Sequence, residues 1–178
     1  AASADLQAPT APADPSRPSL AEQILAGLPV GVLLIHEANP VADRPDGERW
    51  EAALRAVPFV IATSPRRNET TRLAHLHLPD VSYLEKWSIH AGATSEGCPV
   101  WSVGEPLLEP VGGRPLGATL IALARAAGGG AAAACPWADP AQVVTAYAES
   151  LHAKPGQGMI FGPEVAEMWS RLLERSGW

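Results

Sequence analysis

The fold of this chain is decided by one stretch, Val30-Gly-Val-Leu-Leu-Ile-His36, and by the residues that follow it. This run of Leu and β-branched residues predicts a strand buried on both faces, as in parallel sheets. Asp46–Val57 has apolar residues at helical spacing and predicts an amphipathic helix. Pro58-Phe-Val-Ile-Ala62 predicts a second buried strand. Strand, helix and strand in this order form one βαβ unit, whose crossover is expected to be right-handed.

Further elements are expected on either side of this unit. Ser19, with Glu22 three residues later, predicts the capped start of a short helix over Leu20–Leu28. Asn68 predicts the cap of a helical turn over Glu69–Leu73. The other expected elements are a third strand over Ala74–Leu78, a helical turn within Val81–Trp87, an extended stretch over Cys98–Pro110, a surface loop over Gly128–Ala134, and helices over Gly117–Ala127, Pro140–Ala153 and Pro163–Arg175.

The composition excludes several classes of protein. The 178 residues suffice for one domain with its own core, and 47% of them are apolar. A net charge of −6 argues against a nucleic-acid partner, which needs a basic face. The apolar run Ile24–Ile35 is too short, and too interrupted by Gly and Pro, to cross a membrane. Cys98 and Cys135 lie too far apart for a CxxC metal site or an iron–sulfur cluster.

The residues that follow the strands are candidate ligand-binding groups, because open parallel sheets bind ligands outside the carboxyl ends of their strands. Asn39 offers an amide that both donates and accepts hydrogen bonds. Thr63, Ser64 and Thr70 offer hydroxyls. The helical turn that begins at Asn68 is expected to offer free backbone amides to an anion. The alternative is that all of these are ordinary turn and capping residues, and the pattern leaves both interpretations open.

The histidines are a second group of candidate ligands. His75 and His77 alternate on one expected strand and so share a face, and with His36 and His90 they are potential zinc ligands. The favoured interpretation is that they are surface or cofactor-facing histidines at a strand end. No nucleotide-binding motif accompanies them, because Gly128-Gly-Gly130 lacks the Lys-Ser/Thr of a phosphate loop and no GxGxxG follows the first strand.

A series of short motifs runs along the chain in a fixed order. It consists of the apolar run that ends in Asn39-Pro40, the helix around Trp50–Leu54, the strand Pro58–Ile61, then Glu69-Thr70, Leu78-Pro79 and Tyr83-Leu-Glu-Lys-Trp87, followed by Glu105–Pro110, Leu120–Ala127 and Leu172–Trp178. This series resembles one region of the molybdopterin oxidoreductases, the bis-molybdopterin guanine dinucleotide enzymes of the dimethyl sulfoxide reductase superfamily. Within that superfamily it is most similar to the catalytic subunits of polysulfide, thiosulfate or tetrathionate reductases.

The resemblance implies a fold and a set of site residues. It implies an α/β fold: a Rossmann-like αβα domain with a short parallel sheet, followed by a loop-rich segment and C-terminal helices. In that family the domain holds the guanosine end of a pterin dinucleotide. The implied domains are a flexible lead-in over residues 1–18, the cofactor-binding domain over 19–127, and a Gly/Ala loop with a helical extension over 128–178. The implied cofactor-binding residues are Asn39, Pro40, Thr63, Ser64, Glu69, Thr70 and His75.

The sequence departs from the family at two points. His75 stands where the family usually has Asp, and an imidazole does not accept hydrogen bonds in the bidentate manner of a carboxylate. The four-cysteine cluster region, the domain that supplies the molybdenum ligand and the C-terminal β-rich domain have no counterpart here. We therefore expect that this segment is not catalytic alone and holds no metal by itself.

The expected function is that of a fragment or split subunit of a molybdopterin oxidoreductase. It would bind the guanosine part of molybdopterin guanine dinucleotide, while the parent enzyme carries out redox chemistry on a small oxyanion or sulfur compound. The alternative is a non-catalytic structural subunit of a membrane respiratory complex with an empty pterin site. A third interpretation, a free-standing hydrolytic nucleotide binder, lacks a catalytic base.

The resemblance also implies partners and a location. The expected partners are the remaining domains or subunits of the oxidoreductase, including iron–sulfur and membrane-anchor subunits for electron transfer. Neither nucleic acid nor a direct membrane span is expected. The implied location is the periplasm or a bacterial membrane complex, although no secretory signal opens the sequence. Apolar surface is expected where missing domains would pack.

Overall fold

A computed structural model of the protein describes residues 18–93, 99–153 and 164–175. These residues form two compact units. The described residues up to 82, together with 110–116, form the sheet–helix unit, and the other described residues form the hairpin–helix unit. The expected domain boundaries at residues 18 and 127 stay predictions. Most of the expected lead-in lies outside the described residues.

The sheet–helix unit is built on three parallel strands. They are β1 (Val32–His36), β2 (Phe59–Ser64) and β3 (Leu76–Pro79), and they lie in the order β1-β2-β3. Leu34 pairs with Ile61, and Ile61 pairs with Leu76, so the carboxyl ends of all three strands meet at one edge of the sheet. The prediction of an α/β fold with a short parallel sheet of the Rossmann-like kind is confirmed.

Four short helices belong to the same unit: α1 (Leu20–Leu25), α2 (Pro40–Asp43), α3 (Gly47–Ala56) and α4 (Glu69–Leu73). The capping box between Ser19 and Glu22 forms as predicted, but α1 ends earlier than expected. Asn68 also forms a capping box and starts α4 at the predicted residue. The strand–helix–strand order of β1, α3 and β2 is the predicted βαβ unit.

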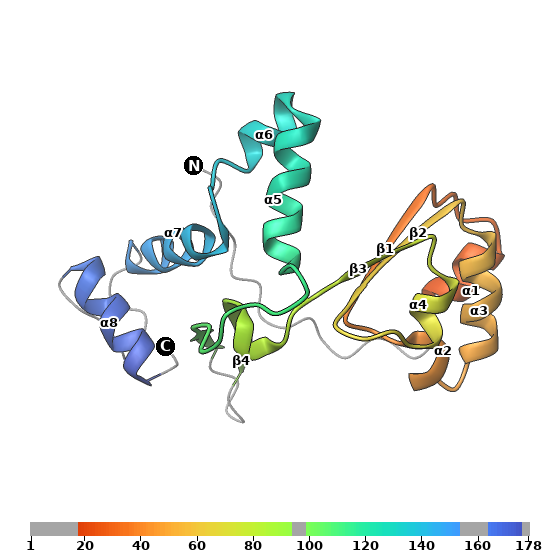
Figure 1. Ribbon diagram of the computed structural model, residues 1–178, viewed down its shortest axis with the longest axis horizontal. Helices are drawn as coiled ribbons and strands as arrows, with labels where there is room; N and C mark the ends of the chain where they lie inside the picture. Colours follow the sequence, from red (N-terminus) through yellow and green to blue (C-terminus); the bar gives the residue numbers. More distant parts are fainter. Residues whose placement is uncertain (1–17, 94–98, 154–163, 176–178) are drawn as a thin grey trace. The chain divides into compact units, whose positions relative to one another are not determined.

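The helices cover one face of the sheet (Figure 1). On that face Ile35, Val60 and Leu54 lie in a buried cluster with residues of α1 and α3. Several residues of the opposite face are exposed, with Val32 at 61%, and they include Leu34, Phe59 and Leu76. The prediction that the first strand is buried on both faces was therefore wrong, because an apolar run does not by itself supply a second layer of helices.

A returning segment completes the carboxyl edge of this sheet. Residues 110–116 lie apart in sequence from the rest of the unit. The Arg114 N–H donates to the carbonyl of Pro79 at 3.0 Å. Gly113 packs so closely on the backbone of Asp80 that a Cβ there would lie 2.5 Å from the Asp80 carbonyl oxygen. Glycine is therefore required where this segment crosses the end of β3.

The hairpin–helix unit begins with a 3₁₀ turn, η1 (Tyr83–Glu85). It continues with β4 (Ser88–Ala93), β5 (Pro99–Gly104), α5 (Leu116–Ala127), α6 (Gly129–Ala134), α7 (Pro140–His152) and α8 (Val165–Arg175). The strands β4 and β5 pair antiparallel, so much of the expected extended stretch is one half of a hairpin. Val103, Val144 and Leu172 lie in its buried cluster. None of the helices in the described part of the chain is long and apolar enough to span a bilayer.

One element of this unit contradicts the sequence analysis. The expected surface loop over 128–134 is largely the short helix α6. Ala has the highest helix propensity of all residues, and Gly128 adopts a φ of 67° that lets the chain turn sharply before the helix begins. The low complexity of the segment therefore reflects alanine helix formation rather than a loop.

Candidate functional site

The predicted site residues that follow the strands gather at the carboxyl edge of the sheet. His36 pairs with Thr63, and Ser64 pairs with Pro79, so the three strand ends are neighbours. Thr63 and Ser64 are buried there. Pro40, also predicted, is buried as the first residue of α2. This edge is where open α/β sheets bind ligands.

Asn39 is the centre of a hydrogen-bond network at this edge. Its Oδ1 accepts from the Thr70 N–H at 3.1 Å and from Thr70 Oγ1 at 2.8 Å. Its Nδ2 donates to Glu69 Oε2 at 2.8 Å. The Thr70 hydroxyl in turn accepts from the Val41 N–H at 3.3 Å. One amide thus joins the end of β1 to α2 and α4, and three predicted site residues lie in direct contact.

The start of α4 differs from its expected state. The Thr70 N–H is bonded to Asn39, and the Thr71 N–H is bonded to Asn68 Oδ1 at 2.8 Å. The Asn68 N–H donates to Thr71 Oγ1 at 2.7 Å. The expectation that this helix start offers free amides to an anion was wrong, because nearby side chains already accept from these groups.

Glu69 is the charged member of the network. The hydrogen bond from Asn39 holds the pKa of the Glu69 carboxyl below its ordinary value, assisted by its own backbone N–H and by the charge of Arg72. Like an ordinary glutamate, the side chain is ionised at neutral pH, and it presents a hydrogen-bond acceptor at the sheet edge.

Replacing Asn39 with alanine is expected to raise the pKa of Glu69 toward its ordinary value. In the parent, the stabilisation that comes from the lowered pKa of Glu69 is present above the ordinary pKa and is lost as the pH falls through the lowered one, and the variant should lack most of it at every pH. A ¹³C NMR titration of the Glu69 carboxyl measures this. Arg72→Gln is the matched control and should raise the pKa less, because Arg72 is the weaker cause. An equal or larger rise in Arg72→Gln would contradict the assignment.

The histidines of the sheet–helix unit are not brought together. His75 lies just before β3, away from the carboxyl edge, where its Nδ1 accepts from the Val60 N–H at 3.0 Å and its ring stacks on Phe59. His77 Nε2 contacts the Ser64 carbonyl at 3.0 Å. His90 lies on β4 of the other unit. The alternative of a four-histidine zinc site finds no support in these positions, and the cofactor role of His75 stays a prediction.

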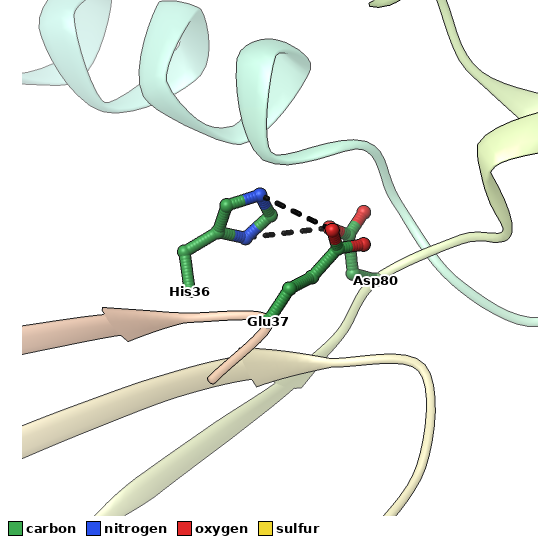
Figure 2. A group of neighbouring side chains, drawn as sticks. All are labelled: His36, Glu37 and Asp80. Carbon is green, nitrogen blue, oxygen red and sulfur yellow. Dashed lines mark ion pairs between the residues drawn. The ribbon is translucent and has the colours of Figure 1, made fainter. Parts of the chain in front are cut away.

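The structure places three other groups together at the carboxyl edge, His36, Glu37 and Asp80 (Figure 2). His36 Nδ1 lies 3.5 Å from Asp80 Oδ2, and His36 Nε2 lies 3.9 Å from Glu37 Oε2. The Asp80 side chain is fully buried, whereas those of His36 and Glu37 are partly exposed. Sequence reasoning identified only His36, because Asp80 is 44 positions away and reaches it through sheet pairing.

Comparison with known proteins gives one partial similarity. No known family profile matches the chain. Over 94 residues the chain is 34% identical to the menaquinone reductase, molybdopterin-binding-like subunit, of Nitratidesulfovibrio vulgaris strain Hildenborough. The alignment covers 51% of this chain, and the chain spans only 13% of the length of that relative. With the parallel α/β sheet, this similarity supports a relationship of the chain to the molybdopterin oxidoreductases.

Proposed function

We propose that this chain is the guanosine-binding α/β part of a molybdopterin oxidoreductase-type subunit. The proposal is carried by the Asn39–Glu69–Thr70 network at the carboxyl edge of the parallel sheet. It is supported by the similarity to a subunit whose name states that it is molybdopterin-binding-like. The exposed apolar residues of the sheet, among them Val32 and Phe59, also support a segment that packs against further polypeptide.

Glu69 suits the recognition of guanine. A guanine base presents its N1–H and its 2-amino group side by side, and an ionised carboxylate accepts both. The hydrogen bond from Asn39 fixes the orientation of the Glu69 carboxylate and keeps it ionised. We assign Glu69 to the base edge, with Thr70 holding Asn39 in place. The bound dinucleotide would supply the pterin ligands of the metal, while this chain orients its guanosine end.

The proposal is tested by nucleotide binding to the 178-residue chain. GMP is expected to bind more tightly than IMP, which lacks the 2-amino group, by about 10-fold, the effect of one hydrogen bond to a charged acceptor. Glu69→Gln should reduce GMP affinity and remove this preference. Glu48→Gln, an exposed carboxylate on α3, is the matched control and should bind as the parent does. Equal affinity for GMP and IMP in the folded parent chain would contradict the proposal.

A second candidate function is a non-catalytic structural subunit whose pterin site stays empty. The observation that favours it is that polar groups at the carboxyl edge of the sheet already have hydrogen-bond partners within the protein. The Asn39 side-chain amide and the first backbone amides of α4 are bonded in this way. This candidate predicts that folded protein binds neither GMP nor IMP, and that the subunit isolated with its partners contains no pterin. Membership of a respiratory complex with iron–sulfur and membrane-anchor subunits, and a periplasmic or membrane-associated location, belong to both candidates as proposals.

A further inference from the structure

We propose that His36, Glu37 and Asp80 form a binding site for one first-row divalent cation such as Zn²⁺. Each residue offers one ligand atom, and these atoms lie within 4.8 Å of one another (Figure 2). This site goes beyond the guanosine-binding function and does not depend on it. It also differs from the expectation drawn from the sequence, in which this segment holds no metal.

The separations suit a metal. Zinc bonds of 2.0–2.2 Å in a tetrahedral arrangement place ligand atoms about 3.3–3.6 Å apart. His36 Nδ1 lies 3.5 Å from Asp80 Oδ2, and His36 Nε2 lies 3.9 Å from Glu37 Oε2. The Glu37 carboxylate is thus close to the required separation from Nε2, and side-chain rotation of His36 and Asp80 would bring Asp80 Oδ2, which now faces Nδ1, to the same ion.

The backbone places consecutive residues in one site. Neighbouring residues of a strand point to opposite faces, so His36 and Glu37 would normally diverge. Glu37 instead has a φ of 47°, in the left-handed region, and the chain leaves the strand there. Its carboxylate thereby reaches the imidazole of His36. Asp80 is supplied by the residue after β3 and is held by the Val81 N–H, which donates to its Oδ1 at 2.8 Å.

Thr63 orients the imidazole. Its Oγ1 lies 2.7 Å from His36 Nδ1, on the central strand between the two that supply the ligands. Metal-binding histidines use their second ring nitrogen in such a hydrogen bond, which fixes both the tautomer and the ring orientation. We therefore assign Nε2 of His36 as the metal ligand and Thr63 as its positioning residue. The partial exposure of His36 and Glu37 provides the entry path, while Asp80 forms the buried side of the site.

The ligand set selects the class of metal. Imidazole nitrogen favours Zn²⁺ over the hard cations Mg²⁺ and Ca²⁺, which take oxygen ligands. Within the first row, N/O sites bind Zn²⁺ more tightly than Mn²⁺. Three protein ligands leave a fourth tetrahedral position open, so a bound ion would keep a water or an exogenous ligand.

The test is calorimetric titration of the 178-residue chain with Zn²⁺ alone, and absorption spectroscopy with Co²⁺ as a coloured substitute. We expect saturable binding of one ion per chain. Glu37→Gln and His36→Gln should each weaken binding by more than about 10-fold, and Thr63→Val by about 10-fold with recovery in Thr63→Ser. Circular dichroism confirms that each variant is folded. Glu37→Gln is the decisive variant. The Glu37 side chain is partly exposed, so removing its charge leaves the buried Asp80 in place.

Two matched controls identify binding elsewhere on the chain. Glu51→Gln removes an exposed carboxylate of α3 that pairs with Arg55, and His90→Gln removes an exposed histidine of β4. Both should bind Zn²⁺ as the parent does. The proposal is overturned if the folded parent shows no saturable binding, if Glu37→Gln and His36→Gln bind unchanged, or if either control loses binding to the same extent.

Discussion

Replacing Leu54 with alanine is expected to lower the free energy of unfolding of the sheet–helix unit by about 3–4 kcal/mol, through lost burial and a residual cavity. Leu54 is fully buried on α3 and belongs to a cluster that includes Val60 of β2 and Ile35 of β1. Hydrogen exchange over a urea series measures the effect, because it reports on each unit separately where a single melting curve would mix them. Exchange should rise in β1, β2 and α3.

Leu25→Ala is the matched control for this prediction. Leu25 ends α1 in the same unit and is 48% exposed, so the same truncation there should cost less than about 1 kcal/mol. The α7 and α8 helices form the core of the other unit and should exchange as in the parent. Equal losses in the two variants would show that Leu54 is not the core residue that its burial indicates.

Replacing Gly47 with alanine is expected to destabilise the same unit by about 2–3 kcal/mol, the cost of overpacking at a rigid contact. Gly47 begins α3 and is buried. A Cβ there would collide with the carbonyl oxygen of Val41 in α2, which is backbone and has no rotamer to escape to. The two helices would have to separate, so exchange should rise in both. Helix propensity alone predicts the opposite sign, because alanine favours a helix over glycine.

Gly31→Ala provides the comparison. No atom lies within 4 Å of a Cβ at this position, and its φ is not in the left-handed region. The substitution should leave stability unchanged or raise it by about 0.4–1 kcal/mol, because it restricts only the unfolded chain. If Gly47→Ala proved as stable as Gly31→Ala, the close approach of α2 and α3 would be refuted.

The sequence was most informative where the determinants are local. The Ser19–Glu22 and Asn68 caps and the stripe of α3 each lie within a few residues, and all three helices start at or next to their expected positions. The pairing of β4 with β5 was missed because it depends on contacts between separate segments. The exposed face of β1 was missed because the sequence of an apolar strand looks the same whether helices cover one face of the strand or both.

The candidate site was predictable in part for the same reason. The strand-end pattern pointed to Asn39 and Thr70, the family resemblance implied Glu69, and the fold does bring these residues into contact. Their mutual hydrogen bonds span about 30 positions, so the sequence did not reveal that their polar groups satisfy one another. Glu37 was missed because its approach to His36 depends on a backbone conformation that non-glycine residues rarely adopt.

The returning segment 110–116 sets an order of events during synthesis. The strands and helices from Leu20 to Pro79 are made first, and their βαβ contacts close over short loops. The bond from the Arg114 N–H to Pro79 forms only after 35 further residues have been translated. The end of β3 beside Asp80 is thus the last part of this unit to be completed. A chain cut after residue 82 would retain the βαβ core and lose the backbone that closes its ligand edge.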